Sequence, residues 1–306
     1  MRCCFGNFND MLKEAHGLAP IPTAVIDADE PYVLEGACQA AVAGFISPIL
    51  VGEEKAVRRL LDGIDCKRDF PVIGAERVED MAEKGVELVE KGEAQALMKG
   101  HLHTHEFLHP ILAHHLQGRH RISHVFVADL ETYPKLLFIT DAAVNIAPDL
   151  ITKKEIVQNA VWLARLMGVD TPKVAALSAV EVVTPSIAST IDAACLAKMA
   201  QRGQIEGAVV DGPLAFDNAI SAESARIKGI ESPVSGDVDV LLVPDLESGN
   251  ILAKDLEYLS GARMAGIVLG ARVPVVLTSR SDPPQARLLS CAVASLVSHR
   301  MREDEA

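Results

Sequence analysis

The stretch VDVLLVPDLESGNILAKDL, residues 238–256, runs from a continuous apolar segment through a polar turn into a helix-forming segment. Short apolar runs of the same kind recur along the chain, and each is predicted to be a strand. The others are residues 23–26, 46–51, 96–98, 122–127, 136–139, 174–177, 208–210, 266–269 and 273–277. Because the runs do not alternate with polar residues, they predict strands covered on both faces. The helical patterns between them predict an α/β fold with mainly parallel sheets.

Two helices have clear boundaries in the sequence. Thr152 and Glu155 form a T-x-x-E capping box, and apolar residues then recur on one helical face up to Gly168. A second apolar stripe covers residues 187–199 and is followed by Gly203. We expect both stripes to face the core and to carry no chemistry of their own.

The composition predicts a compact protein that binds no nucleic acid. The chain has 306 residues, 49% of them hydrophobic, which is enough for one large core or two ordinary ones. No Gly/Ser-rich linker interrupts it, so we expect two lobes joined by structured crossings. The formal charge of −13 argues against nucleic-acid binding, which relies on clustered Lys and Arg. A small anionic substrate would therefore need a local basic pocket.

We expect a cytoplasmic protein without a membrane anchor. No apolar run approaches the roughly 20 residues that cross a bilayer. Polar residues within 9–14 interrupt any secretory signal. The cysteines include no C-x-x-C pair, so neither a disulfide framework nor a thiolate zinc site is predicted, and a reducing compartment fits best. They are Cys3, Cys4, Cys38, Cys66, Cys195 and Cys291.

The common nucleotide and hydrolase motifs are missing from the sequence. It contains neither G-x-G-x-x-G nor G-x-x-x-x-G-K-[ST], which disfavours a standard dehydrogenase or P-loop kinase. The absence of G-x-S-x-G disfavours the commonest type of serine hydrolase. Candidate chemistry is therefore expected where polar residues follow predicted strands.

The segment KGHLHTHEFLHPILAHHLQGRHRISH, residues 99–124, holds eight of the ten histidines. We expect a loop and a helix start at the carboxyl end of a strand, with His103, Thr104 and nearby amides facing an anion or a substrate. The alternative is that most of these histidines are surface or helix-capping groups.

A metal site is a further alternative for this segment, although we predict no bound metal. In an extended chain His101, His103 and His105 share one face. In a helix His105 and His109 lie one turn apart. Imidazole groups so placed suit zinc and other transition metals.

Two segments in the middle of the chain place polar residues near predicted strand ends. In FITDAAVNIAPDL, residues 138–150, a strand is followed by Asn145. In VVDGPLAFDNAIS, residues 209–221, a strand is expected to end at Asp211, and Asn218 follows shortly after. Such residues either form turns or line an active site, and we take Asn145, Asp211 and Asn218 as candidate substrate contacts.

A helix entry and a strand end nearer the C-terminus suit an anion. Gly249 and Asn250 are expected at a helix entry whose free N–H groups hold phosphate or form an ordinary cap. In VPVVLTSRSDPPQAR, a strand ends in Ser279, Arg280 and Asp282. Arg280 offers a fork of donors for phosphate or a developing oxyanion, and the alternative is an ion pair at a strand end.

Taken together, these segments resemble the phosphate acetyltransferase/phosphate butyryltransferase family. The resemblance covers residues 96–289, and the ordered set is far more specific than any one member. Its members are LMKGHLHT, RISHVFV, FITDAAVNIAPDL, QNAV, PKVAALSAVEVV, RGQIEGAVVDGPLAFDNAIS, KGI, GDVDVLLVPDLESGN and LTSR.

The resemblance implies a two-lobe α/β fold of the isocitrate/isopropylmalate dehydrogenase-like type. One lobe would comprise residues 1–128 and 269–306, and the other residues 129–268. It also implies an active site in the cleft between the lobes and a homodimer.

The resemblance further implies the reaction of a short acyl-CoA, of acetyl or butyryl type, with phosphate to give acyl phosphate and free CoA. The family's Ser-Arg pair falls on Ser279 and Arg280, and its His-Thr pair on His103 and Thr104. CoA is then a substrate, and no tightly bound cofactor is required. Inorganic phosphate and acyl phosphate are the other expected partners.

The sequence departs from the acetyltransferase branch at two positions. The basic residue that follows the His-Thr pair in that branch is His109 here. The acidic residue about two helical turns after the Ser-Arg pair, proposed as the base, is Ala286 here. Asp282 is the nearest carboxylate, and direct attack by an oriented CoA thiolate is the alternative to a base.

Two other functions remain as alternatives at this point. The histidine cluster also fits a metal-dependent oxidoreductase on a related fold. A protein that keeps the CoA or acyl-phosphate pocket without turnover would be a binding or regulatory protein.

Overall fold

The computed structural model describes all residues except 1–4, 67, 115, 119 and 306. Cys3, Cys4 and His115, which the sequence analysis considered, lie outside the described residues. Contacts divide the chain into two compact units. Unit 1 comprises residues 5–7 and 121–263, and unit 2 comprises residues 8–120 and 264–305. The lobe boundaries implied by the family resemblance stay a prediction.

The sheet of unit 2 has the strand order β3-β2-β1-β4-β11-β10. Its strands are β1 (Ile21–Ile26), β2 (Ile46–Gly52), β3 (Val72–Gly74), β4 (Ala96–Lys99), β10 (Arg263–Leu269) and β11 (Val275–Val276). All neighbours are parallel except β10 and β11. Ile26 pairs with Lys99, and Met98 pairs with Val276. The carboxyl ends of β1, β4 and β11 therefore lie on one edge of this sheet.

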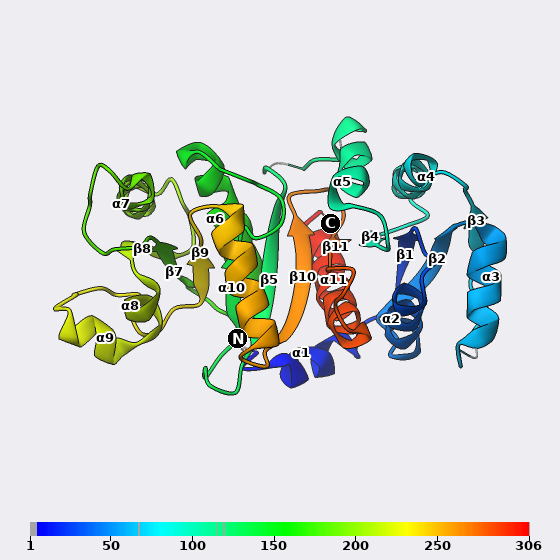
Figure 1. Ribbon diagram of the computed structural model, residues 1–306, viewed down its shortest axis with the longest axis horizontal. Helices are drawn as coiled ribbons and strands as arrows, with labels where there is room; N and C mark the ends of the chain where they lie inside the picture. Colours follow the sequence, from blue (N-terminus) through cyan, green and yellow to red (C-terminus); the bar gives the residue numbers. More distant parts are fainter. Residues whose placement is uncertain (1–4, 67, 115, 119, 306) are drawn as a thin grey trace. The chain divides into compact units, whose positions relative to one another are not determined.

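Helices cover the sheet of unit 2 (Figure 1). They are α1 (Phe8–Ala15), α2 (Pro31–Val42), α3 (Glu54–Gly63), α4 (Val78–Glu90), α5 (Thr104–Ala113) and α11 (Pro284–Glu305). The C-terminal α11 packs along α2 and α1, and α4 packs against α5. Leu289, Cys291 and Val293 of α11 are buried, so this helix contributes to the core of the unit.

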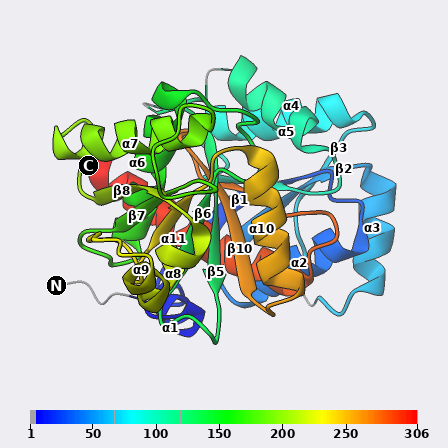
Figure 2. The same ribbon diagram turned by 60° about the vertical axis from the view of Figure 1, so that its left-hand side comes forward.

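The sheet of unit 1 has the order β5-β6-β9-β7-β8, with only β5 and β6 antiparallel among its assigned pairs. Its strands are β5 (Ser123–Asp129), β6 (Leu137–Thr140), β7 (Lys173–Leu177), β8 (Val209–Leu214) and β9 (Val240–Leu242). Its helices are α6 (Leu150–Leu166), α7 (Ala188–Gln201), α8 (Phe216–Ile220), α9 (Ala222–Ile227) and α10 (Leu246–Tyr258). Figure 2 shows α8 and α9 side by side. The α/β prediction with mostly parallel strands is confirmed.

Three local predictions were wrong. The helix expected from a Thr152 cap begins earlier, because the Asp149 carboxylate accepts the Thr152 N–H at 2.7 Å and is the true N-cap. The strand expected to end at Asp211 continues to Leu214, because an irregularity in its pairing with β7 accommodates Pro213 at an edge strand. The short strand β3 was not predicted at all.

Cys38 and Cys66 form a disulfide, so the expectation that the cysteines stay unpaired was wrong for these two residues. The two residues are 28 positions apart, and their Cα atoms lie 6.0 Å from each other. Cys38 is on α2, and Cys66 follows α3. Their proximity depends on the packing of α2 and α3 beside β2, which no cysteine spacing reveals.

No helix in the part of the chain that the structure describes is both long and apolar enough to span a bilayer.

The approach of β1 to the end of β4 depends on Gly100. Its N–H donates to the Ile26 carbonyl at 2.8 Å, and the His101 N–H donates to the Asp27 carbonyl at 3.1 Å. A Cβ on Gly100 would overlap the backbone of Asp27. The residue after β4 must therefore lack a side chain.

Gly100→Ala is expected to lower the free energy of unfolding by about 1–3 kcal/mol, because the added methyl group must displace backbone. Urea unfolding followed by circular dichroism measures the change. The control is Gly63→Ala at the end of α3, where a Cβ meets nothing within 4 Å. Equal stability of Gly100→Ala and the wild type would contradict the close approach.

Candidate functional site

The loop after β4 and the loop after β11 meet in unit 2. Arg280 Nη2 lies 3.2 Å from His103 Nδ1, although the two residues are 177 positions apart. Parallel pairing of β4 with β11 sends both loops to the same edge of the sheet. Ligands in open α/β sheets bind at this edge, so the structure brings together two of the predicted site segments where a ligand is expected.

His103 and Thr104 lie at the N-terminus of α5, as predicted. His103 is the N-cap, and its N–H donates to the Glu106 carboxylate at 2.8 Å. Both His103 and Arg280 are exposed, while Thr104 is half-buried. An exposed guanidinium beside a helix N-terminus is a suitable environment for an anion.

The histidine segment does not form a metal site among the described residues, where no group of three or more His, Cys, Asp or Glu side chains could hold a metal ion. The extended arrangement of His101, His103 and His105 is wrong, because the chain is helical from Thr104 onward. His114 instead contacts the carboxylates of Glu83 and Glu90 on α4, which is the structural role weighed for most of these histidines.

The loop of residues 279–282 is closed by Asp282. Its carboxylate accepts the Ser279 N–H at 2.7 Å, and its own N–H donates to the Ser279 carbonyl at 3.2 Å. The Asp282 side chain is buried, whereas the Ser279 hydroxyl contacts Ser281 Oγ at 3.2 Å. Asp282 therefore shapes the loop that presents Arg280.

Arg287 lies beneath the same loop and was not predicted from the sequence. It is fully buried in the first turn of α11 and donates hydrogen bonds to backbone carbonyls of the loop. Burial holds the pKa of the Arg287 guanidinium below its usual value, and Asp282 opposes this shift. The sequence shows only an arginine and gives no signal of its burial.

Lys99 and Asp27 are two further titratable groups that sequence reasoning missed. Lys99 ends β4, and Asp27 directly follows β1 with φ of 60°. Burial lowers the pKa of Lys99 to about 8, and the positive charges of Arg280 and Arg287 act in the same direction. Burial and the neighbouring Asp29 raise the pKa of Asp27 to about 7, while Lys99 opposes this. The effect of Arg280 and Arg287 on the pKa of Lys99 shows that three cationic side chains lie near one another at the ends of β4 and β11.

In unit 1, Asn145 is bound tightly to Asp141. The Asn145 Nδ2 donates to the Asp141 carboxylate at 2.6 Å and to the Ile122 carbonyl at 2.9 Å. Arg121 Nε donates to Asn145 Oδ1 at 3.0 Å. The Asp141 carboxylate also accepts backbone N–H groups from the turn that follows. These contacts fix the turn after β6.

Gly249 and Asn250 lie against the same turn, but not at a helix entry as predicted. The helix α10 begins at Leu246, because Asp245 is its N-cap and accepts the Ser248 N–H at 2.8 Å. The Gly249 N–H is therefore paired with the Asp245 carbonyl. A Cβ on Gly249 would lie 2.9 Å from the Asp141 carbonyl oxygen, and Asn250 Nδ2 donates to the Ala142 carbonyl at 3.3 Å.

Asp211 and Asn218 have contacts of their own. The Asp211 carboxylate accepts the Gly212 N–H at 2.9 Å within β8. Asn218 is fully buried, and its Nδ2 donates to Glu181 at 3.3 Å. Their predicted roles in substrate binding stay predictions.

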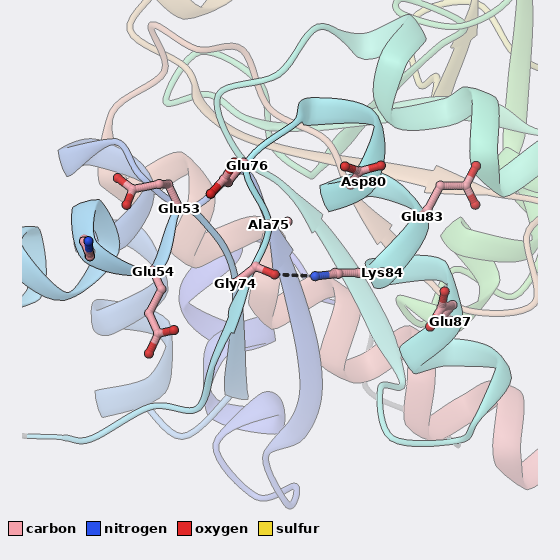
Figure 3. Close-up of a pocket in the computed structure, with 10 residues that line it drawn as sticks. Glu53, Glu54, Gly74, Ala75, Glu76, Asp80, Glu83, Lys84 and Glu87 are labelled. Atoms are coloured by element: carbon pink, nitrogen blue, oxygen red, sulfur yellow. Dashed lines mark hydrogen bonds between the residues drawn. The ribbon is translucent and has the colours of Figure 1, made fainter.

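A pocket of about 640 Å³ in unit 2 lies between α3, β3 and α4 (Figure 3). Its lining contains two lysines and a larger number of carboxylates. They belong to Glu53, Glu54, Glu76, Asp80, Glu83 and Glu87. None of the predicted site residues lines it, and its negative charge does not suit a phosphate-bearing ligand.

A second pocket of about 650 Å³ lies within unit 1, at the carboxyl ends of β7 and β9. Its wall includes Leu177, Phe216 and Leu252, and the ion pair of Lys153 with Asp192, with Nζ and Oδ2 2.6 Å apart. Paired charge and apolar side chains suit an uncharged part of a ligand.

A family model described as "Phosphate acetyl/butaryl transferase" matches residues 67–294. The phosphate acetyltransferase of Rickettsia prowazekii is 51% identical over 296 residues, which cover 95% of this chain and 84% of that protein. The phosphate butyryltransferase of Clostridium acetobutylicum is 41% identical over 295 residues, with coverage of 95% and 98%. A branched-chain phosphotransacylase from Enterococcus faecalis V583 has a similar crystal structure. The TM-score is 0.78 at 32% identity, and the match covers 91% of this chain and 99% of that one.

Asp27→Asn is expected to stabilise the protein more at pH 8 than at pH 5. The pKa of Asp27 is raised from 3.8 to about 7 in the folded protein, so folding favours the protonated carboxyl and stability is lost as the pH rises between these values. The Asn variant lacks this loss. The free energies of unfolding of both proteins in urea at the two pH values measure the difference, and a constant or shrinking gap would contradict it.

Proposed function

We propose that this chain, which belongs to the phosphate acetyl/butyryltransferase family, transfers a short acyl group between coenzyme A and inorganic phosphate. The reaction is acyl-CoA plus phosphate giving acyl phosphate plus CoA. The observation that carries the proposal is the contact of Arg280 with His103, since it unites the family's Ser-Arg and His-Thr pairs at one sheet edge.

In the proposed reaction, a phosphate oxygen attacks the thioester carbonyl and a tetrahedral oxyanion forms. The C–S bond then breaks, and the sulfur leaves as a thiolate that takes up a proton. In the reverse direction, a thiol of unperturbed pKa about 8.5 must lose that proton before it attacks acyl phosphate. Both directions place negative charge on the acyl oxygen and on phosphate, so the site must supply positive charge and hydrogen-bond donors.

The cations of unit 2 are suited to these demands. Arg280 is exposed and offers a planar fork of donors, which we assign to the phosphate or to the developing oxyanion. Lys99 adds charge behind it, and Ser279 adds a hydroxyl beside it. The predicted catalytic role of Asp282 stays a proposal, and its contact with the Ser279 N–H supports a contribution through the shape of the loop.

We also propose that residues of unit 1 complete the substrate site. The turn after β6 is held by Asp141 and Asn145, and Asn250 contacts it. The parallel neighbour of β6, strand β9, ends at the same edge of the sheet. Polar residues at such strand ends are suited to bind CoA or phosphate. The two-lobe, isocitrate/isopropylmalate dehydrogenase-like arrangement with a cleft is part of this proposal.

The proposed enzyme needs no tightly bound cofactor and works in the cytoplasm, where CoA esters and phosphate are at hand. We propose that it acts as a homodimer. Several large apolar side chains of unit 1 are each exposed over more than half of their surface, which is typical of an association surface. They include Ile146, Ile151, Ile251 and Leu259.

Arg280→Ala is expected to lower kcat by about 30- to 1000-fold, the loss of about 2–4 kcal/mol that removal of one oxyanion donor causes. Thiol release from acetyl-CoA, propionyl-CoA and butyryl-CoA in the presence of phosphate measures it. The control is Arg58→Ala on α3, which also removes one positive charge but breaks only an exposed ion pair with Glu54. Near-normal turnover of folded Arg280→Ala would remove Arg280 from the mechanism, and an inactive wild type would reject the proposed function.

Ile251→Asp is expected to shift the protein from dimer to monomer, because a charge would be buried in the proposed interface. Size-exclusion chromatography with light scattering measures the mass, which should be twice that of one chain for the wild type. Val42→Asp replaces a comparably exposed residue of unit 2 and should leave the dimer intact. A monomeric wild type would contradict the proposal.

A further inference from the structure

Arg287 carries its charge into the core of unit 2. Its side chain is only 1% exposed, although arginine is rarely buried without a specific partner. Gly36 on α2 makes room for it, since a Cβ there would lie 2.8 Å from the Arg287 Cδ. The close packing of α2 on α11 thus guides the guanidinium to the loop of residues 279–282.

The guanidinium contacts the main chain of this loop at three points. Its Nη1 donates to the Asp282 carbonyl at 2.6 Å, and its Nη2 donates to the carbonyls of Ser279 at 3.2 Å and Arg280 at 3.4 Å. No hydrogen-bond partner for its Nε is found among the described residues. Within the described part of the chain, the hydrogen bonds of this side chain therefore all go to the loop.

Burying the cation of Arg287 costs free energy, so its presence must be explained by the groups that it contacts. An apolar side chain of similar volume would fill the same space without the cost of desolvating a cation. A lysine would keep the charge, but its single nitrogen cannot match the spread of a planar fork. Arginine is therefore the side chain suited to this position, because it alone offers several donors in a fixed plane.

We propose that Arg287 is a positioning residue for acyl transfer, which holds the carbonyls of Ser279, Arg280 and Asp282 so that the Arg280 side chain projects toward His103. The inference rests on the proposed function. Arg287 itself does not touch the substrate. It acts through the loop, and Gly36 acts through Arg287.

The first test is Arg287→Lys, which keeps the charge and removes the fork. We expect kcat for acyl transfer to fall by about tenfold or more while the protein stays folded, because the loop loses its alignment. The control is Leu296→Ala on the same helix, which truncates a buried side chain nine positions further along and lowers stability through the core. Both variants are assayed well below their melting temperatures.

The decisive quantity is kcat of Arg287→Lys relative to kcat of Leu296→Ala. A deficit of about fivefold or more supports positioning, and a smaller one overturns it, since the fork would then matter only for stability. Should Arg287→Lys fail to fold, Gly36→Ala provides the same comparison. It leaves the arginine in the chain but displaces its stem, and the same threshold applies.

A readout that does not need turnover separates this inference from the proposed function. The ring signals of His103 in an NMR spectrum, assigned with His103→Gln, should shift in Arg287→Lys and stay in place in Leu296→Ala. Unchanged His103 signals in Arg287→Lys would overturn the inference even in an active enzyme. If the wild type transfers no acyl group but the signals shift, the proposed function fails and the alignment of the loop by Arg287 stands.

Discussion

The parallel pairing of β4 with β11 is the constraint on which the candidate site depends. It joins Leu97 to Val275 and Met98 to Val276, so two loops from distant parts of the sequence start at neighbouring points of one edge. Backbone hydrogen bonds hold this register. Burial also specifies it, because a slip by one residue would turn the buried side chains toward the opposite face of the sheet. The pairing of the two strands by itself brings the loops of Arg280 and His103 close together, and the contact between the two side chains follows from that.

The electrostatics of the chain are uneven in a way that the net charge hides. A formal charge of −13 predicts little affinity for anions, yet three cations gather within one unit, at the ends of β4 and β11. The lowered pKa of Lys99 is a consequence of that crowding and of burial. Carboxylates are collected instead around the pocket beside α3 and α4. This distribution of charge attracts anions to the ends of β4 and β11 and repels them from the acidic pocket.

Most of the strands could be predicted from the sequence, because apolar runs are local signals. The polar segments around His103 and Arg280, which the structure brings together, could be found as polar residues that follow such runs. Arg280 became a candidate because a fork of donors after a buried strand suits an anion, with an ion pair at the strand end as the alternative. Arg287 and Asp27 could not be identified, since their importance comes from burial and from neighbours that are remote in the sequence. The start of α10 was misplaced at Gly249 and Asn250, because the cap that Asp245 forms with the Ser248 N–H was not recognised in the sequence.

The divided sequence of unit 2 has a consequence for biosynthesis. Its sheet joins β4 (Ala96–Lys99) to β11 (Val275–Val276), so β4 has no β11 beside it until the chain has been made as far as Val276. Closing so long a loop is entropically costly, and the unfinished edge exposes unpaired backbone groups meanwhile. Nascent chains that stall before β11 would therefore present an open strand, and such chains are natural substrates for chaperones.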